Sequence, residues 1–273
     1  MSQTILITGA SSGIGLATAL LFQQRGWHVA ATMRQPDGAD ALTESATLKR
    51  YRLDVVDEAS IQTAVAQIQK DFGNIDVVLN NAGYGAVGPF EAATGEQIEK
   101  QFNTNVFGLM AVIRAVLPQM RAQRSGVIIN VSSVGGRVAL PLNSLYHGTK
   151  FALEGFTESL YYELDPLGIR VKLIEPGGVR TNFINAVEIL HNPELSDYTP
   201  LVEKTVQAFA SRRENYAPPE ACAEVIYTAA TDGIKQLRYV SGEDAEQLIA
   251  AHESMTQEQY YAMVQSRFFG ASQ

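Results

Sequence analysis

The sequence predicts an α/β protein built as one domain around a doubly wound parallel sheet of about seven strands, with helices on both faces. Short apolar runs alternate with longer stretches of helical periodicity along most of the 273 residues. Parallel strands need long crossover connections, and the helical stretches supply them. No linker rich in Pro, Gly or Ser divides the chain, and no internal repeat is present. We therefore expect residues 1–273 to form a single domain.

The expected strands are seven apolar runs, several of them flanked by turn residues: 4–8, 28–33, 51–53, 77–79, 127–131, 171–174 and 237–240. Helical patterns lie between them at 14–24, 59–72, 95–123, 144–164 and 219–230. The C-terminal stretch 255–269 is amphipathic and is expected to pack on the body of the protein or on a partner.

The segment at about 183–213 interrupts this alternation after the sixth predicted strand. In open α/β sheets, ligands bind outside the carboxyl ends of the strands. A long insertion at this point is in position to cover that crevice, so we interpret it as a substrate lid. The alternative is a solvated surface excursion.

Composition excludes several classes of function. The net charge of −8 and the lack of any Lys/Arg run argue against a nucleic-acid surface. No apolar run approaches the ~20 residues that span a bilayer, and no basic leader opens the chain. His147, His191, His252 and Cys222 lack the spacing of metal ligands. With one cysteine and no possible internal disulfide, we expect a cytoplasmic protein without a metal or a membrane partner.

A glycine-rich turn follows the first predicted strand and opens the first predicted helix. Glycines permit a tight turn and let the backbone approach a pyrophosphate closely, and the helix N-terminus offers unpaired N–H groups to the anion. The spacing is G-x-x-x-G-x-G, and it predicts a phosphate site made by Gly9, Ser11, Ser12, Gly13, Ile14 and Gly15. A plain strand–helix turn is the alternative.

The end of the second predicted strand bears on which dinucleotide is bound. NAD sites usually place an acid there to hold the ribose hydroxyls. This chain has Thr32, Met33 and Arg34 at that point, and no acid. A guanidinium suits a 2′-phosphate, and Ser11 is in position to add a hydrogen bond. The pattern favours NADP(H) over NAD(H), although an exposed Arg at a strand end is also common.

Three further segments are candidate contacts with the cofactor. Asp54 is placed to bond the adenine amino group, with Val55 on the ring; alternatively, Asp54 caps the helix that begins near Asp57. Small and turn-forming residues follow the fourth strand, and we expect Asn81, Ala82 and Gly83 to lie close to the cofactor. The segment after the sixth strand is expected to lie against the nicotinamide through Pro176, Gly177, Val179 and Thr181.

Tyr146 and Lys150 are four residues apart and so share one face of a predicted helix. An ammonium nearby favours the phenolate and lowers the pKa of a tyrosine, which can then exchange a proton with a carbonyl or alcohol oxygen. Ser132 and Ser133 end the fifth predicted strand, where a hydroxyl is suited to hold a substrate oxygen. Asn105 lies within a mostly apolar predicted helix and needs a hydrogen-bonding partner.

Taken together, these motifs resemble the short-chain dehydrogenase/reductase superfamily, in family order, from about Thr4 to Thr181. The resemblance implies a Rossmann-type fold. It implies Tyr146 as the general acid/base, Lys150 as the residue that holds the nicotinamide ribose and lowers the tyrosine pKa, and Asn105 as the anchor of a water in a proton relay. It also selects Ser133 over Ser132, since the family serine lies 13 residues before the tyrosine.

A narrower resemblance links the chain to the 17β-hydroxysteroid and retinol dehydrogenase branch, through Ser133–Gly136, Leu140–Asn143, Lys150–Gly155 and Leu237–Tyr239. It implies NADP(H). The wider family resemblance implies a homodimer or homotetramer, whose interface would use helices 95–123 and 144–164. The function expected is reversible reduction of a ketone or aldehyde to its alcohol. The alternative is a non-catalytic NADP(H)-binding redox sensor, which would usually lack the tyrosine or the lysine.

Overall fold

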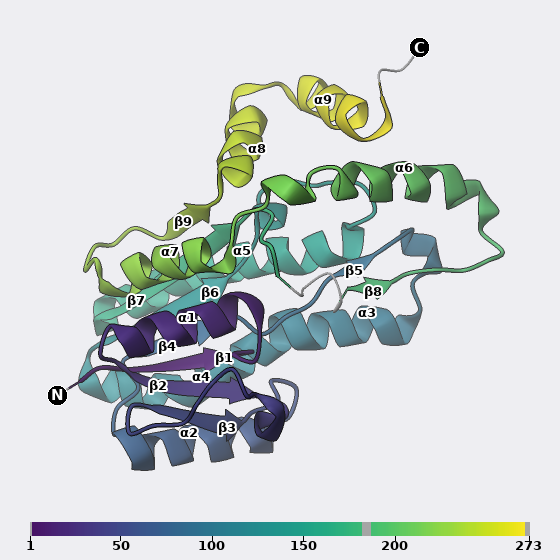
Figure 1. Ribbon diagram of the computed structural model, residues 1–273. Coiled ribbons are helices and arrows are strands. Elements are labelled where there is room, and N and C mark those ends of the chain that lie inside the picture. The colour runs from purple at the N-terminus through teal and green to yellow at the C-terminus, as the bar shows by residue number, and fades with distance from the viewer. Residues whose placement is uncertain (1, 182–186, 271–273) are drawn as a thin grey trace.

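The computed structural model of the chain describes residues 2–181 and 187–270, and its centre is a seven-stranded parallel sheet (Figure 1). The strands follow the order β3-β2-β1-β4-β6-β7-β9. Their bounds are β1 Thr4–Thr8, β2 His28–Met33, β3 Leu48–Arg52, β4 Val77–Asn80, β6 Gly126–Val131, β7 Ile169–Pro176 and β9 Arg238–Ser241. The predicted sheet is thereby confirmed. The third strand begins three residues earlier than the apolar pattern indicated, because Lys49 and Arg50 interrupt that pattern.

Helices cover both faces of the sheet, and alternate residues of each strand supply the two cores. Ile5 and Ile7 of β1 face α1 (Gly13–Gln24) and α7 (Pro219–Thr231), whereas Leu6 faces the opposite layer. That layer contains α2 (Glu58–Phe72), α4 (Gly108–Gln123) and α5 (Ser144–Leu164). The described residues thus form one doubly wound domain, as the sequence predicts.

One predicted helix is in fact three pieces. The stretch 95–123 divides into α3 (Gly95–Phe102), a π-helical turn at Asn103–Phe107, and α4. A π turn arises where a side chain or backbone contact displaces the regular hydrogen bonds, and it is frequent at functional sites. Hydrophobic periodicity does not report this change, since both flanking pieces remain helical.

The predicted lid is partly structured. Its residues 183–186 lie outside the described residues. Beyond them, β8 (Glu188–Ile189) pairs in parallel with β5 (Ala86–Val87), which follows β4, and α6 (Thr199–Ala210) runs above the carboxyl edge of the sheet (Figure 1).

The chain closes with α8 (Glu243–Ser254) and α9 (Gln257–Phe269), and the amphipathic stretch forms α9. An apolar cluster joins Tyr260, Val264 and Phe268 of α9 to Phe209 of α6. Among the residues described, no helix is long and apolar enough to span a membrane.

Candidate active site

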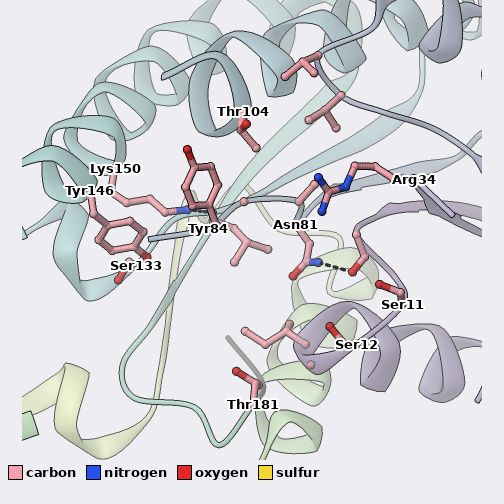
Figure 2. Close-up of a pocket in the computed structure, with 18 of the residues that line it drawn as sticks. Ser11, Ser12, Arg34, Asn81, Tyr84, Thr104, Ser133, Tyr146, Lys150 and Thr181 are labelled. Carbon is pink, nitrogen blue, oxygen red and sulfur yellow. Dashed lines mark hydrogen bonds between the residues drawn. The ribbon is translucent and has the colours of Figure 1, made fainter. Parts of the chain in front are cut away.

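A cavity of about 910 Å³ runs along the carboxyl ends of β1, β2, β4, β6 and β7. Eighteen of the twenty candidate site residues line it: Gly9, Ser11, Ser12, Gly13, Ile14, Arg34, Asp54, Val55, Asn81, Ala82, Gly83, Ser133, Tyr146, Lys150, Pro176, Gly177, Val179 and Thr181. Figure 2 shows Tyr146, Lys150 and Ser133 at one end of the cavity and Arg34 and Ser11 at the other. Gly15 and Asn105 are not among its described lining residues.

The glycine-rich turn forms a cradle between β1 and α1. Gly9 and Gly13 have positive φ values of 68° and 55°, which other residues adopt only with strain. A Cβ at Gly15 would lie 2.3 Å from the Gly9 carbonyl oxygen, so this glycine lets helix and turn pack closely. Ser12, the N-cap of α1, makes no side-chain cap hydrogen bond within the described structure. The first-turn N–H groups are therefore available to a phosphate.

Asn81 fixes this turn to β4. Its Nδ2 donates to the carbonyl oxygens of Thr8 and Gly9, at 2.9 and 3.1 Å. The Thr8 hydroxyl accepts hydrogen bonds from the backbone N–H groups of Asn81 and Ala82, both at 3.0 Å. The segment after β4 is thus tied by hydrogen bonds to the glycine-rich turn.

The end of the cavity away from Tyr146 is formed by β2, β3 and the loop after β3. Arg34 follows β2, is exposed, and lines the cavity. Asp54 accepts a hydrogen bond from the N–H of Val56 at 3.2 Å, and Asp57 rather than Asp54 caps α2 by accepting from Ser60. The alternative of Asp54 as the cap is therefore wrong, which leaves its carboxylate at the cavity wall.

Tyr146 and Lys150 project from α5 toward the carboxyl end of β6. The Lys150 Nζ donates to the Val131 carbonyl at 2.8 Å and lies 5.7 Å from the centre of the Tyr146 ring. Burial raises the pKa of the Tyr146 phenol, and its hydrogen bond with Ser133 opposes that rise. The sequence led us to expect a lowered pKa. In the protein alone, burial prevails, and the phenol keeps its proton at neutral pH.

Ser133 and Ser132 both line the cavity, but they differ in their contacts. The Ser133 hydroxyl accepts from the N–H of Gly135 at 3.0 Å and bonds Tyr146. Ser132 is 3% exposed, and a Cβ at Gly136 would lie 2.7 Å from its Oγ, so its hydroxyl is packed against the following turn. The geometry thus brings Ser133 rather than Ser132 to the tyrosine.

Asn105 sits in the π-helical turn and clamps the chain that follows β4. Its Oδ1 accepts from the N–H of Tyr84 at 3.1 Å, and its Nδ2 donates to the Tyr84 carbonyl at 2.9 Å. The same Nδ2 donates to the Thr149 hydroxyl at 3.2 Å. The side chain therefore positions backbone beside the cavity, and its part in a proton relay stays a prediction.

Sequence reasoning missed the wall made by Tyr84, α3 and the π turn, whereas β8 lies within the predicted lid segment. Tyr84 follows the Asn80–Gly83 segment directly, and this adjacency was the one signal available for it. Lys100 lies 5.4 Å from the centre of the Tyr84 ring and forms an ion pair of 2.9 Å with Glu188. From the sequence, Ser132 is a candidate to hold the substrate oxygen, and Glu188 lies in the predicted lid; the cavity residues not predicted are Met33, Leu53, Val56, Tyr84, Glu96, Glu99, Lys100, Asn103, Thr104 and Val131.

His147 lies beside the site but serves the loop that carries Ser133. It is buried, and its Nδ1 accepts from the N–H of Leu140 at 3.2 Å. Burial lowers the pKa of this imidazole to about 4, so it is neutral in this role. Within residues 2–181 and 187–270, no group of His, Cys, Asp and Glu is arranged to hold a metal ion.

A doubly wound sheet with a glycine cradle after its first strand defines the class of dinucleotide-binding α/β proteins. Residues 3–189 match the family model for short chain dehydrogenases. The chain therefore belongs to the short-chain dehydrogenase/reductase family, and it is an oxidoreductase of that family.

Relatives place it near the branch that the sequence resembles. The chain is 35% identical to human 17-beta-hydroxysteroid dehydrogenase type 1 over 260 residues, covering 89% of this chain and 79% of the relative. It is 36% identical to human retinol dehydrogenase 8 over 225 residues, covering 79% and 70%. It is 40% identical to 3-ketodihydrosphingosine reductase of Bacteroides thetaiotaomicron over 207 residues, covering 76% and 73%.

Solved structures agree on the fold. A short-chain dehydrogenase from Streptomyces avermitilis superposes with a TM-score of 0.83 at 33% identity, covering 95% of this chain and 96% of the other. ElxO, solved with NADP, has a TM-score of 0.75 at 25% identity, covering 90% and 100%. The 3-ketoacyl-(acyl-carrier-protein) reductase of Brucella melitensis, solved with NADH, has a TM-score of 0.72 at 25% identity, covering 87% and 96%. Neighbours of this fold thus include both cofactor types.

Proposed function

We propose that the protein is an NADP(H)-dependent oxidoreductase that interconverts a ketone or aldehyde and its alcohol. The observation that carries this proposal is the hydrogen-bonded pair of Tyr146 and Ser133, with Lys150 behind it, at one end of a cavity whose other end is the glycine cradle. A non-catalytic sensor has no need of this arrangement.

Each side chain has a task that its surroundings support. Tyr146 is protonated at neutral pH because of burial, so it donates its proton to the carbonyl oxygen in reduction and takes it back in oxidation. Ser133 orients the substrate oxygen and stabilises the charge that develops on it. Lys150 carries the positive charge that favours the tyrosinate left after proton donation.

The cavity residues fit a nicotinamide dinucleotide. The Gly9–Gly15 turn would hold the pyrophosphate, Asp54 and Val55 the adenine, Lys150 the nicotinamide ribose, and Pro176–Thr181 the nicotinamide carboxamide. Bound NADP(H) supplies or accepts the hydride. Arg34, with Ser11 nearby, supports a 2′-phosphate and hence NADP(H) over NAD(H).

The experiment that tests this proposal is a substrate panel followed by NADPH absorbance and repeated with NADH. The names of the relatives suggest its members: a 17-ketosteroid, retinal, 3-ketodihydrosphingosine and simple ketones and aldehydes. Tyr146→Phe should lower kcat/KM about 10²–10⁴-fold on any substrate found, because it removes the transferable proton. NADPH binding, followed by fluorescence titration, should change little.

Tyr162→Phe on the same helix is the matched control, because that side chain is 71% exposed and remote in sequence from the pair. It should leave turnover unchanged. Appreciable residual activity in Tyr146→Phe would contradict the assigned role. A wild-type protein that binds NADPH but turns over no member of the panel would favour the redox-sensor alternative.

Three further parts of the proposal concern the whole protein. We propose that the segment 187–213 acts as the substrate lid, since α6 runs above the carboxyl edge of the sheet (Figure 1). We propose a cytoplasmic homodimer or homotetramer that associates through α4 and α5. Phe151 of α5, 47% exposed, and Phe107, at the N-cap of α4 and 56% exposed, supply apolar surface for that interface.

A further inference from the structure

A buried carboxylate stands one helical turn beyond Lys150. Glu154 lies four residues further along α5, on the same face of the helix, and is 5% exposed, against 8% for Lys150. Unpaired buried carboxylates are costly, so a glutamate at this depth requires a reason. Glu154 does not line the described cavity, so direct contact with a ligand does not account for its burial.

Two arginines from other elements hold this carboxylate and its neighbours. The Nε of Arg238, on β9, lies 3.0 Å from Glu154 and 3.2 Å from Glu175 of β7. The same guanidinium donates to Glu158 of α5 at 2.6 Å. Arg137, in the turn after Ser133, lies 3.3 Å from Glu175 and 2.6 Å from Glu253 of α8.

The charges of this cluster do not cancel. It combines four carboxylates, Glu154, Glu158, Glu175 and Glu253, with two guanidiniums. Burial, together with the charge of Glu154, raises the pKa of Glu175 to about 6. The second oxygen of Glu154, Oε1, has no hydrogen-bond partner among the described residues. The cluster therefore carries more negative than positive groups, and its Glu154 lies one helical turn from Lys150.

Lys150 needs such a counter-charge. Its Nζ donates to one neutral carbonyl, that of Val131, and burial lowers its pKa to about 8. The charge on Glu154 opposes that decrease. Without it, burial alone would leave the amine uncharged closer to neutral pH, and a neutral amine does not favour the tyrosinate.

We propose that Glu154, held by Arg238, is a positioning residue that acts through Lys150 by keeping this side chain in its ammonium form. The proposal rests on the proposed function for its catalytic consequence, but the charge state of Lys150 is a property of the protein itself. Glu154 contacts neither substrate nor cofactor and contributes only through the electrostatic field at Lys150.

The test is an NMR titration of the lysine side-chain resonances in the full-length protein, with Lys150 assigned by its loss in Lys150→Met. Glu154→Gln should lower the titration midpoint of Lys150 by about one pH unit. In the active enzyme, the apparent pKa of the alkaline limb of the kcat–pH profile should fall by the same amount. For a midpoint that falls from about 8 to about 7, turnover at pH 8 falls about five-fold.

Glu158→Gln is the matched control, since it removes a carboxylate from the same arginine on an exposed turn of α5, where the side chain is 51% exposed. It should leave the Lys150 midpoint unchanged, and Glu154→Asp, which keeps the charge, should hold the midpoint close to its wild-type value. If Glu154→Gln does not fold, Glu154→Met removes the same charge without leaving an unpaired amide.

An unchanged Lys150 midpoint in the folded Gln or Met variant would overturn the proposal. So would an equal shift in Glu158→Gln. If the wild-type protein reduces no carbonyl compound, the proposed function fails, while the NMR midpoint still decides the role of Glu154.

Discussion

Arg34 is the single side chain on which the proposed choice of dinucleotide rests. It follows β2 at the end of the cavity proposed to hold the adenosine, and it is exposed. An exposed guanidinium contributes little to the stability of the fold. We therefore expect its contribution to be to cofactor binding, through a charge-assisted hydrogen bond with a 2′-phosphate.

Arg34→Ala should therefore raise the KM for NADPH about 10–100-fold, the equivalent of one or two charged hydrogen bonds. The KM for NADH should change by less than about two-fold, since NADH offers no 2′-phosphate. Initial rates with each cofactor measure this. Arg52→Ala is the control: Arg52 ends the neighbouring strand, bonds Ser60 and does not line the described cavity. Equal effects on both cofactors would remove the argument for NADP(H).

At the scale of elements, the close packing of α1 on its preceding turn sets the phosphate cradle. The Gly9 carbonyl oxygen occupies the space that a side chain at position 15 would need. The helix N-terminus can approach a pyrophosphate only because this contact is so short.

Gly15→Ala should destabilise the protein by about 1–3 kcal/mol, since the added methyl group forces helix and turn apart. It should also weaken NADPH binding at least ten-fold. Gly155→Ala in α5 is the matched control, because nothing lies within 4 Å of a Cβ there. That change should stabilise by roughly 0.5–1 kcal/mol through helix propensity. Urea unfolding and fluorescence titration measure both effects, and a neutral Gly15→Ala would show that α1 can move freely.

At the scale of the whole molecule, the C-terminal helices support the proposed lid. Phe268 of α9 packs edge-on against Phe209 of α6, with ring centres 5.2 Å apart, and Arg212 lies over the same ring at 4.8 Å. Arg212 also donates to the carbonyl of Arg267 at 2.9 Å. The last helix thus fixes α6 from outside the central sheet.

Phe268→Ala should lower the free energy of unfolding by about 3 kcal/mol, because it removes the packing between α6 and α9. Hydrogen exchange should accelerate in residues 199–210, and the KM for the carbonyl substrate should rise while kcat changes little. Tyr261→Ala, which truncates a 53% exposed side chain of α9, is the control and should do neither. Unchanged exchange in α6 would mean that the lid segment is held by other contacts.

The strands and the cavity residues that follow them could be predicted because both depend on local patterns. Strand ends meet at one edge of a parallel sheet, so Gly9, Arg34, Asn81 and Ser133 converge whatever the details of packing. Lys100 and Glu188 could not be found in this way. They reach the cavity through an ion pair between segments 88 residues apart, which no local pattern encodes.

The π-helical turn at Asn103–Phe107 has a consequence for the gene as well as for the protein. A π turn holds one residue more than the α-helical path it replaces, and each α-helical residue turns the chain by about 100°. Deleting a single codon here would convert α3, the turn and α4 into one continuous α-helix whose flanking faces stay in register, so the displacement would be confined to the turn itself. Asn105 would swing away from Tyr84, and the wall of the cavity would open although every residue lining its far end remained intact.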